Sequence, residues 1–301
     1  MELEVKNITK SFNEKEVLKG ISFSATSGSA LGLLGRNGAG KTTTIRIIMQ
    51  LFAPNTGEVL LDGKPLDIRN VNIGYMPEER GLYPKKKILE QLIYFAELKG
   101  VSRSVAKERA KRLLVRLGME EYENAKLTTL SKGNQQKIQL IATLICDPDI
   151  VILDEPFSGL DPVNAMLLKD VVRELIADNK IVLFSSHQMN YIEEFCNEVV
   201  ILNKGTIAVK GKIKDIKRSY TRNKLSVHTS DAESAKAVLN GAETVLSIED
   251  TPYGLLVELA HEDDKNALIK LLIESDVKFD GVINYEPTMS EIFVDYTEDS
   301  I

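Results

Sequence analysis

Short apolar runs alternate with amphipathic segments along the first two thirds of the chain. The runs LEVKNITKSF, KGISFSA, ALGLLG, IVILDEP and KIVLFSSH are typical of buried strands, and GEVLLDG and EVVILNKGTIAVKG predict hairpin strands. The spacing of apolar residues predicts a helix over residues 41–51 and a helical region over residues 88–146. Strands that alternate with helices predict an α/β fold, with a mostly parallel sheet, an antiparallel edge and a helical subdomain.

The last third of the chain follows a different pattern. Residues 216–224 (IKRSYTRNK) are polar and irregular, and we predict a linker at residues 218–224. Beyond it, the strands KLSVHTS, AETVLSIED, YGLLVELA and VKFDGVINYEP and the helices DAESAKAVL and DKNALIKLLIES follow the order β-α-β-β-α-β, before an amphipathic segment, PTMSEIFVDYTED. This order is typical of ferredoxin-like domains. We therefore predict a first domain at residues 1–217 and a small α+β domain at residues 225–301.

A glycine-rich loop, GRNGAGKTT, follows the strand LGLL and opens the helix predicted from residue 41. It fits the pattern G-x-x-x-x-G-K-[ST] of a P-loop NTPase in the strand–loop–helix context that this motif requires. The glycines let successive backbone N–H groups point at phosphate oxygens, the lysine adds a positive charge on the β- and γ-phosphates, and Thr42 is placed to ligate Mg²⁺. The alternative is a glycine turn that merely packs. The residues expected to bind ATP here are Gly35, Asn37, Gly38, Ala39, Gly40, Lys41, Thr42 and Thr43.

Two further strands end in side chains that suit nucleotide hydrolysis. In DIVILDEP, Asp154 is expected to hold Mg²⁺ through water, and Glu155 to polarise the attacking water as general base. The alternative is a solvated pair of acids, which the upstream P-loop disfavours. IVLFSSH ends in His187, which we expect to contact the γ-phosphate and orient the water, although a lone histidine at a strand end is often structural. With Lys41, these residues form the predicted catalytic set.

Composition excludes several other classes of protein. The longest apolar runs fall short of a membrane-spanning helix, and the N-terminus MELEVKNITK lacks the apolar region of a signal peptide. The two cysteines, Cys146 and Cys196, lie far apart in apolar surroundings, which suggests reduced thiols in a cytosolic protein. A net charge of −6 argues against a general nucleic-acid binder.

Taken together with LSKGN at residues 130–134, these motifs resemble the nucleotide-binding subunit of an ABC transporter over roughly residues 3–211. LSKGN is similar to the family's signature motif, LSGGQ, and lies just upstream of DIVILDEP. The resemblance implies a head-to-tail dimer in which Ser131 and Gly133, with Asn134 in place of the signature glutamine, bind ATP held by the partner's P-loop. A plain helix cap by Ser131 is compatible with that role, since one group can do both.

The resemblance implies roles for other positions. Asp161, in FSGLD at residues 157–161, is expected at the dimer interface, and Phe12 stands where the family usually has an aromatic residue stacked on adenine. The alternative for Phe12 is a core phenylalanine. In NIGYMPEERGLYP, Glu78 replaces the glutamine that usually assists the metal; a carboxylate can accept a hydrogen bond from a metal-bound water but cannot donate one. Lys132, which replaces a signature glycine, lies near the partner's phosphates or in solvent.

A narrower resemblance rests on GLYPKKK and EPTMSEIF, which are similar to ATPases of ABC-2-type exporters of the sodium-extrusion and drug-resistance group. It implies an ATPase that uses ATP and Mg²⁺, forms a homodimer or a heterodimer with a related subunit, and drives a separately encoded membrane permease. We accordingly expect a cytoplasmic protein, peripheral on the inner face of the membrane, with no nucleic-acid partner. The alternative, a soluble ABC ATPase acting on nucleic acid or ribosomes, is disfavoured because the chain has one motif set and no coiled-coil insertion.

Overall fold

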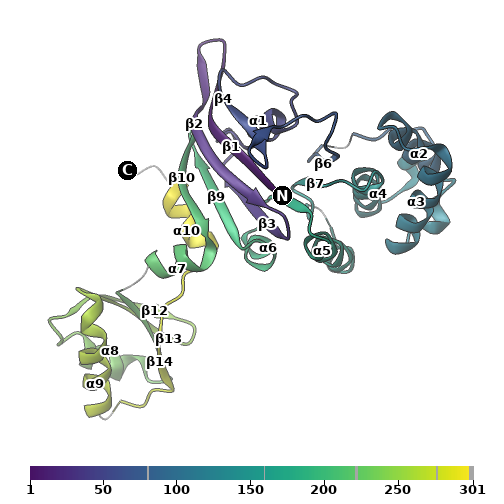
Figure 1. The fold of residues 1–301 in the computed structure, drawn as a ribbon. Coiled ribbons are helices and arrows are strands. Elements are labelled where there is room, and N and C mark those ends of the chain that lie inside the picture. Colours follow the sequence, from purple (N-terminus) through teal and green to yellow (C-terminus); the bar gives the residue numbers. More distant parts are fainter. Residues whose placement is uncertain (80, 159, 221–222, 276, 298–301) are drawn as a thin grey trace. The chain divides into compact units, whose positions relative to one another are not determined.

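The computed structural model describes the chain except for residues 80, 159, 221–222, 276 and 298–301 (Figure 1). The chain divides into two units, the first comprising Met1–Ile213 and Phe293–Ile301 and the second Lys214–Ile292. The first unit contains a six-stranded sheet in the order β10-β9-β3-β8-β7-β6 and a four-stranded sheet in the order β2-β1-β4-β5. The predicted α/β fold, with a mostly parallel sheet and an antiparallel part, is therefore confirmed.

In the six-stranded sheet, neighbouring strands are parallel except for β9 and β10, which form an antiparallel hairpin. Apolar runs on both faces bury the central strands completely, as is usual for parallel strands covered by helices. The strands of the six-stranded sheet are β3 (Ser29–Gly35), β6 (Ile73–Met76), β7 (Ile150–Asp154), β8 (Ile181–Ser185), β9 (Glu198–Asn203) and β10 (Thr206–Lys212). Those of the antiparallel sheet are β1 (Glu2–Phe12), β2 (Lys15–Thr26), β4 (Thr56–Leu61) and β5 (Lys64–Pro65).

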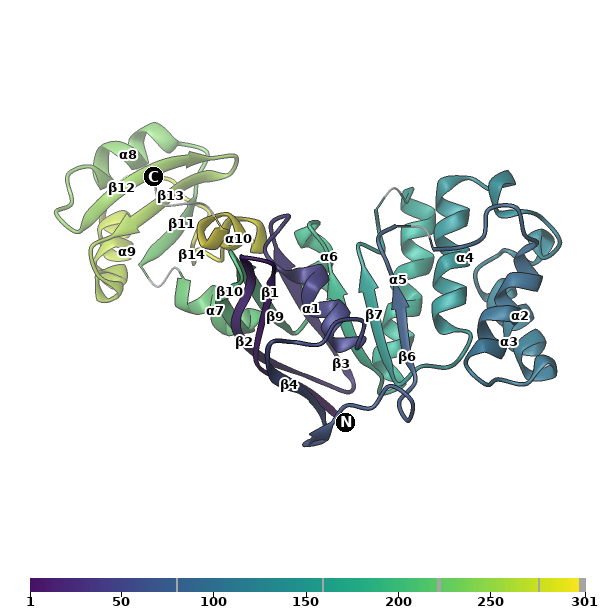
Figure 2. The ribbon, with the colours of Figure 1, turned by 90° about the horizontal axis from the view of Figure 1, so that it is seen from above.

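The helices of the first unit divide between the sheet and a separate group. Figures 1 and 2 both show α2, α3 and α4 together beyond the β6 edge of the sheet, as the predicted helical subdomain requires. Among the described residues, none of the helices combines the length and the apolar composition needed to cross a bilayer. The helices of this unit are α1 (Lys41–Ile48), α2 (Ile88–Leu98), α3 (Arg103–Arg116), α4 (Lys132–Leu144), α5 (Pro162–Ala177) and α6 (Met189–Phe195), with 3₁₀ turns at Glu120–Tyr122 and Leu127–Thr129.

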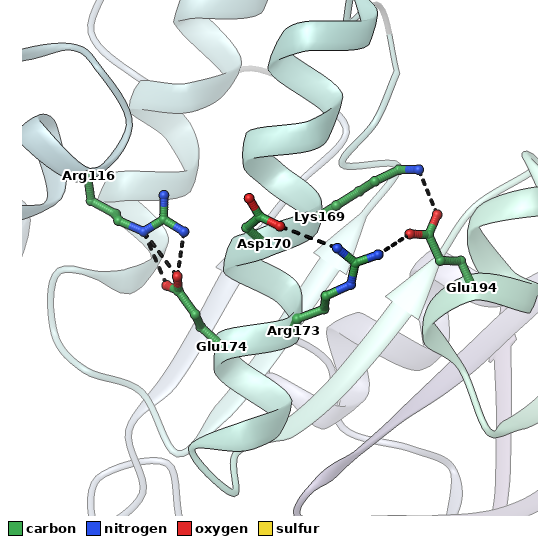
Figure 3. A network of polar contacts seen from close by, with 6 residues as sticks. All are labelled: Arg116, Lys169, Asp170, Arg173, Glu174 and Glu194. Carbon is green, nitrogen blue, oxygen red and sulfur yellow. Dashed lines mark hydrogen bonds and ion pairs between the residues drawn. The ribbon is translucent and has the colours of Figure 1, made fainter.

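Ion pairs on α5 connect the helical group to the rest of the unit (Figure 3). Arg116, the last residue of α3, donates from Nε to Glu174 Oε1 at 3.1 Å. Arg173, the residue before Glu174 on α5, pairs with Glu194 of α6 at 2.6 Å, and Lys169 pairs with the same glutamate at 2.7 Å. These side chains are partly exposed, so each pair contributes about 1 kcal/mol or less, and the network orients α3, α5 and α6 more than it stabilises them.

The second unit has the predicted β-α-β-β-α-β order, and its four strands form an antiparallel sheet in the order β12-β13-β11-β14. That order places the first and third strands side by side in the middle, as the ferredoxin-like arrangement requires. Its core is built from the inward residues of the two central strands and of α8 and α9. The elements are β11 (Lys224–His228), α8 (Ala232–Leu239), β12 (Val245–Thr251), β13 (Gly254–Leu259), α9 (Lys265–Glu274) and β14 (Gly281–Asn284), with a 3₁₀ turn at Glu262–Asp264.

Two helices correct the predicted boundaries. Residues 218–220 of the predicted linker belong to α7 (Ile213–Tyr220), because Ile213 and Ile216 share one helical face and are 8% and 6% exposed. Residues 221–222 of that linker lie outside the described residues. The amphipathic segment at the end of the chain forms α10 (Met289–Thr297), which begins in the second unit, although its residues from 293 onward group with the first.

Candidate functional site

The site forms where three neighbouring strands end at the same edge of the parallel sheet. The register of β7 and β8 pairs Asp154 with Ser185, so the residues that follow each strand emerge side by side. Next to β8 lies β3, whose last residue, Gly35, begins the glycine loop. Ligands of open α/β sheets collect at the carboxyl ends of the strands. The register therefore brings together motifs that lie far apart in the sequence.

The loop between β3 and α1 has a conformation that requires glycine at two positions. Gly35 and Gly40 have φ angles of +154° and +113°, and a Cβ atom on them would lie 2.7 Å from the carbonyl oxygen of Leu202 and 2.5 Å from Leu18 Cδ2, respectively. The open end of α1 has no acidic side chain in its first turn and no side-chain cap on its N–H groups. Free N–H groups at a helix start favour an anion, so the loop fits a phosphate group.

Lys41 is the first residue of α1, and its ammonium group turns back over the loop. Its Nζ donates a hydrogen bond to the carbonyl oxygen of Gly35 at 2.5 Å. Burial lowers the pKa of the Lys41 ammonium from its ordinary value, and the carboxylates of Glu155, Asp154 and Glu78 oppose that shift. A partly buried cation with three carboxylates nearby and no direct ion pair to them lies where phosphate charge can bind.

Asp154 is 6% exposed, and two hydroxyl groups hold its carboxylate. Ser185 Oγ donates to its Oδ1, and the Tyr75 hydroxyl lies 3.5 Å from its Oδ2. Burial, followed by the charge of Asp154, raises the pKa of Tyr75 to about 12, so the phenol stays a neutral donor at ordinary pH. The carboxylate is thereby oriented without a cationic partner, as suits a group that accepts from a metal-bound water.

Glu155 and His187 contact each other directly. His187 Nδ1 lies 2.8 Å from Glu155 Oε2, which also accepts a hydrogen bond from Ser186 Oγ at 3.3 Å. Glu155 is 8% exposed and has a φ angle of +51°, an uncommon backbone conformation for a residue with a side chain. The His187 side chain, in contrast, is 69% exposed. The pair thus places a carboxylate under an accessible imidazole, the arrangement of a base with an orienting partner.

A cavity of about 530 Å³ connects these groups. Glu78, which is exposed, lies on its wall, whereas Ala39 of the glycine loop is buried. Among the described residues, no group of three or more His, Cys, Asp or Glu side chains is placed to hold a metal ion by itself. The donors present suit Mg²⁺ bound jointly with phosphates. Of the predicted site residues, the cavity is lined by Gly35, Asn37, Gly38, Gly40, Lys41, Thr42, Thr43, Glu78, Asp154, Glu155 and His187.

The other predicted residues lie outside this lining. Phe12 is 40% exposed and packs edge-on against Phe52, with 5.4 Å between ring centroids. Ser131 is the N-cap of α4 and accepts a hydrogen bond from Asn134 N at 3.3 Å. Asp161 caps α5 in the same way, and the hydrogen bond from the Asn164 N–H holds the pKa of its carboxyl below the usual value. Their proposed contacts with nucleotide or partner stay predictions.

Gly133 lies on the side of α4 that faces the start of α5. A Cβ atom added to it would lie 3.1 Å from Asn164 Nδ2, so a larger residue would press on the side chain that also binds Asp161. Gly159, the glycine of FSGLD, lies outside the described residues. The contact still shows that the starts of α4 and α5, each capped by a predicted interface residue, form one continuous surface.

Two glutamines on α4, which the sequence analysis did not single out, connect this helix to the catalytic strands. Gln136 Nε2 donates to the carbonyl oxygen of Pro156 at 2.8 Å, next to Glu155. Gln139 is 4% exposed, and its Nε2 donates at 2.6 Å to the carbonyl oxygen of Pro77, beside Glu78. Helix α4 is therefore bonded to the backbone next to both carboxylates. The spacing of three residues, which places both amides on one face of α4, was the available signal.

Comparison with known proteins identifies the architecture. Residues 18–158 match the family described as ABC transporter, and residues 211–297 match the C-terminal domain of DrrA1-3-like ATP-binding proteins. An uncharacterised ABC transporter ATP-binding protein of Bacillus subtilis, YhaQ, is 40% identical over 296 residues, which cover 97% of each chain. The chain belongs to the ABC transporter family. It is an ABC ATPase, as the resemblance of its motifs indicated.

One further relative and one solved structure show which members of the family the chain resembles. The linearmycin resistance ATP-binding protein LnrL of Bacillus subtilis is 34% identical over 71% of this chain and 70% of its own. A solved dimeric ATP-binding cassette, in a post-hydrolysis state bound to ADP and Pi, is 27% identical, with a TM-score of 0.63 over 70% of this chain and 98% of its own. The ABC ATPase is thus related to exporter-type ATPases, and its cassette has the fold of one that is dimeric.

Some groups in the site had no signal in the sequence motifs. Ser185 and Ser186 lie in the quoted run IVLFSSH, but only the register of β7 and β8 shows that they face Asp154 and Glu155. Val17 and Phe293 also line the cavity with the glycine loop, and although Phe293 ends the segment EPTMSEIF quoted above, neither residue was predicted to lie in the site. Phe293 lies more than two hundred residues after the loop, so only the folded chain shows the two together.

Proposed function

We propose that this ABC ATPase hydrolyses ATP to drive a separately encoded membrane permease through ATP-dependent dimerisation.

 

Transport in the export direction is supported by the similarity to the Nod factor export ATP-binding protein I of Burkholderia lata. One observation carries the proposal. The cavity of about 530 Å³ joins the phosphate loop to Asp154, Glu155 and His187, while Ser131, the signature serine, caps an exposed helix start outside it. Because the signature motif lies outside the cavity of its own chain, we infer that a second chain supplies it to complete the site. We accordingly place the protein at the inner face of the membrane, bound to its permease.

The residues of the cavity divide the chemistry among them. The backbone N–H groups of the loop and the ammonium of Lys41 bind the phosphates, and Glu155 accepts the proton of the attacking water. His187, hydrogen-bonded to Glu155, orients that water and contacts the γ-phosphate. Thr42 and Asp154 would hold Mg²⁺, with Glu78 near it. When bound, Mg²⁺ neutralises charge that develops on the phosphates.

The helix start at Ser131 suits an anion supplied by another molecule. The Ser131 and Lys132 side chains are exposed, and the first turn of α4 contains no acidic residue. The free N–H groups and the positive end of the helix dipole therefore attract negative charge. A partner's ATP, held on its own glycine loop, supplies that charge in a head-to-tail dimer. Asp161, at the start of the neighbouring helix, would then lie at the same interface.

A charge placed at Ser131 tests this dimer. Ser131→Asp and Ser131→Asn both preserve an N-cap of α4, because aspartate and asparagine cap helices about as well as serine. In the dimer, the aspartate would face the partner's phosphates, and we expect ATP hydrolysis to fall by roughly tenfold or more, since opposed like charges cost several kcal/mol. Ser131→Asn should lose much less activity, and both variants should bind MgATP as monomers like the wild type. Equal hydrolysis by the two variants would contradict a composite site.

An apolar groove provides a surface for the permease. A cavity of about 390 Å³ is bordered by α2, α4 and the segment that leads to Glu78, and Leu82, Phe95 and Leu98 lie on its wall. Leu98 is 65% exposed although it is apolar. Exposed apolar surface of this kind marks interaction sites. Because Gln139 ties this segment to α4, a permease segment seated in the groove would contact the part of the chain that carries Glu78.

Leu98→Asp is expected to release the ATPase from membranes that contain its permease. The substitution places a charge in the groove, and the fraction of the protein that sediments with those membranes should fall several-fold. Val115→Asp is the matched control, because Val115 is 62% exposed on α3 and does not line the groove. ATP hydrolysis by the isolated protein should be the same for both variants. Undiminished sedimentation of Leu98→Asp would exclude the groove as the docking site.

A further inference from the structure

The last helix of the chain brings an aromatic ring to the nucleotide cavity. Phe293 of α10 is partly buried and lines the same cavity as Gly40 and Lys41. Its neighbours on the helix, Met289 and Ile292, are fully buried, at 0% exposure each. These two apolar residues are enclosed, whereas the ring of Phe293 stays partly accessible on the cavity wall.

The end of α10 is anchored close to the glycine loop. Asn203 Nδ2 donates a hydrogen bond to the carbonyl oxygen of Tyr296 at 3.1 Å, and Thr297 Oγ1 donates to that of Phe293 at 2.6 Å. Asn203 ends β9, and the residue before it, Leu202, pairs with Gly35 at the start of the loop. A short path of hydrogen bonds thus connects α10 to the backbone that cradles phosphate.

Phe12, the residue expected to stack on adenine, packs against another phenylalanine and does not line the cavity. The Phe12 ring contacts Phe52, and the ammonium of Lys10 lies 5.2 Å from its centroid. Neither Phe12 nor Phe52 lines the cavity, whereas Val17 and Phe293 do. A purine needs an apolar or aromatic surface for its face, and stacking on an aromatic ring stabilises a bound base. In this structure, the ring that lines the cavity is Phe293.

We propose that Phe293 contacts the base of the bound nucleotide, so that α10 forms part of the nucleotide site. The proposal rests on the proposed function, since it takes ATP as the ligand of the cavity. In this arrangement the glycine loop binds the phosphates, and the C-terminal segment binds the base. Nucleotide binding therefore favours the conformation of α10 that presents this ring to the cavity.

A single tryptophan tests the contact directly. The chain contains no tryptophan, so Phe293→Trp introduces one fluorophore at the proposed contact. We expect its emission to change on addition of MgATP and not on addition of magnesium tripolyphosphate, which has the phosphates but no base. Phe12→Trp, examined in parallel, should respond less. A silent Phe293→Trp protein that binds MgATP by calorimetry, or one that responds equally to both ligands, would overturn the proposal.

Removing the ring measures its contribution. Phe293→Ala should raise the Kd for MgATP by about 3- to 10-fold, as expected for one lost ring–ring contact, with the Kd for tripolyphosphate unchanged. Phe293→Tyr should restore affinity, and Val294→Ala, on an exposed position of the same helix, should have no effect. Equal losses for both ligands would show a structural role and overturn the base contact. If the wild type bound neither ligand, the proposed function itself would fail, so the two failures are distinguishable.

Discussion

Replacing Glu155 by glutamine is expected to lower kcat for ATP hydrolysis by about 10²–10⁴-fold while MgATP still binds. Glutamine has nearly the same shape and can keep contacts to Ser186 and His187, but its amide cannot take a proton from the attacking water. The loss should therefore fall on the chemical step. It should appear in single-turnover hydrolysis, with the Kd for MgATP by calorimetry within a few-fold of the wild type.

The same variant also reports on dimerisation. If ATP joins two chains, a protein that binds ATP but does not hydrolyse it should accumulate as a dimer in sedimentation experiments with MgATP. Glu79→Gln is the matched control, because Glu79 is exposed and does not line the cavity, and it should hydrolyse ATP like the wild type. Wild-type turnover by Glu155→Gln would remove this carboxylate as the base. A monomer under these conditions would argue against the composite site.

Lys41→Ala is expected to raise the Kd for MgATP by roughly 10- to 100-fold, because each hydrogen bond to a charged group is worth about 1.5–3 kcal/mol. The ammonium lies over the loop, bonded to the Gly35 carbonyl, where it can turn to the phosphates. Lys41→Arg keeps the charge but not the compact shape of the ammonium group. Its affinity for MgATP should therefore lie between those of the wild type and Lys41→Ala. Calorimetry with MgATP and with tripolyphosphate measures both, and the two ligands should lose affinity equally.

In the absence of nucleotide, Lys41→Ala should not destabilise the protein. Burial lowers the pKa of Lys41 in the folded chain, so below that pKa the protonated lysine opposes folding. Lys41→Ala removes this cost, and its Tm without ligand should equal or exceed that of the wild type, while the rise in Tm produced by MgATP should shrink. A lower Tm without ligand would show that Lys41 supports the fold, and the binding loss could then not be assigned to lost phosphate contacts.

Glu78 lies where the resemblance predicts a glutamine, and its exposure limits the effect of its charge on a bound phosphate. A third carboxylate beside Asp154 and Glu155 adds negative charge to a cavity that must bind phosphates. In this structure Glu78 is exposed, and its charge contributes to raising the pKa of Lys41 against the effect of burial. Solvent screens an exposed carboxylate. Glu78 therefore repels a bound phosphate less strongly than a buried carboxylate would.

Some elements were predictable because the residues that form them are contiguous. The glycine loop needs positive φ angles at Gly35 and Gly40, and only the residue type at those positions provides them without strain. The order of strands and helices in the second unit was likewise readable from periodicity, and its sheet order confirms the ferredoxin-like prediction. Residues 218–220 of the predicted linker instead belong to the helix α7, for which two isoleucines three residues apart are a weak signal.

The amino-acid sequence by itself determined the phosphate loop, the acidic strand end and the family, because each depends on a few neighbouring residues whose backbone angles and spacing act locally. Only the tertiary structure decided which groups meet across the chain. The pairing of β7 with β8 placed Ser185 on Asp154, and the packing of α10 placed Phe293 in the nucleotide cavity. Such contacts depend on strand register and on burial of distant apolar faces, which no local pattern specifies.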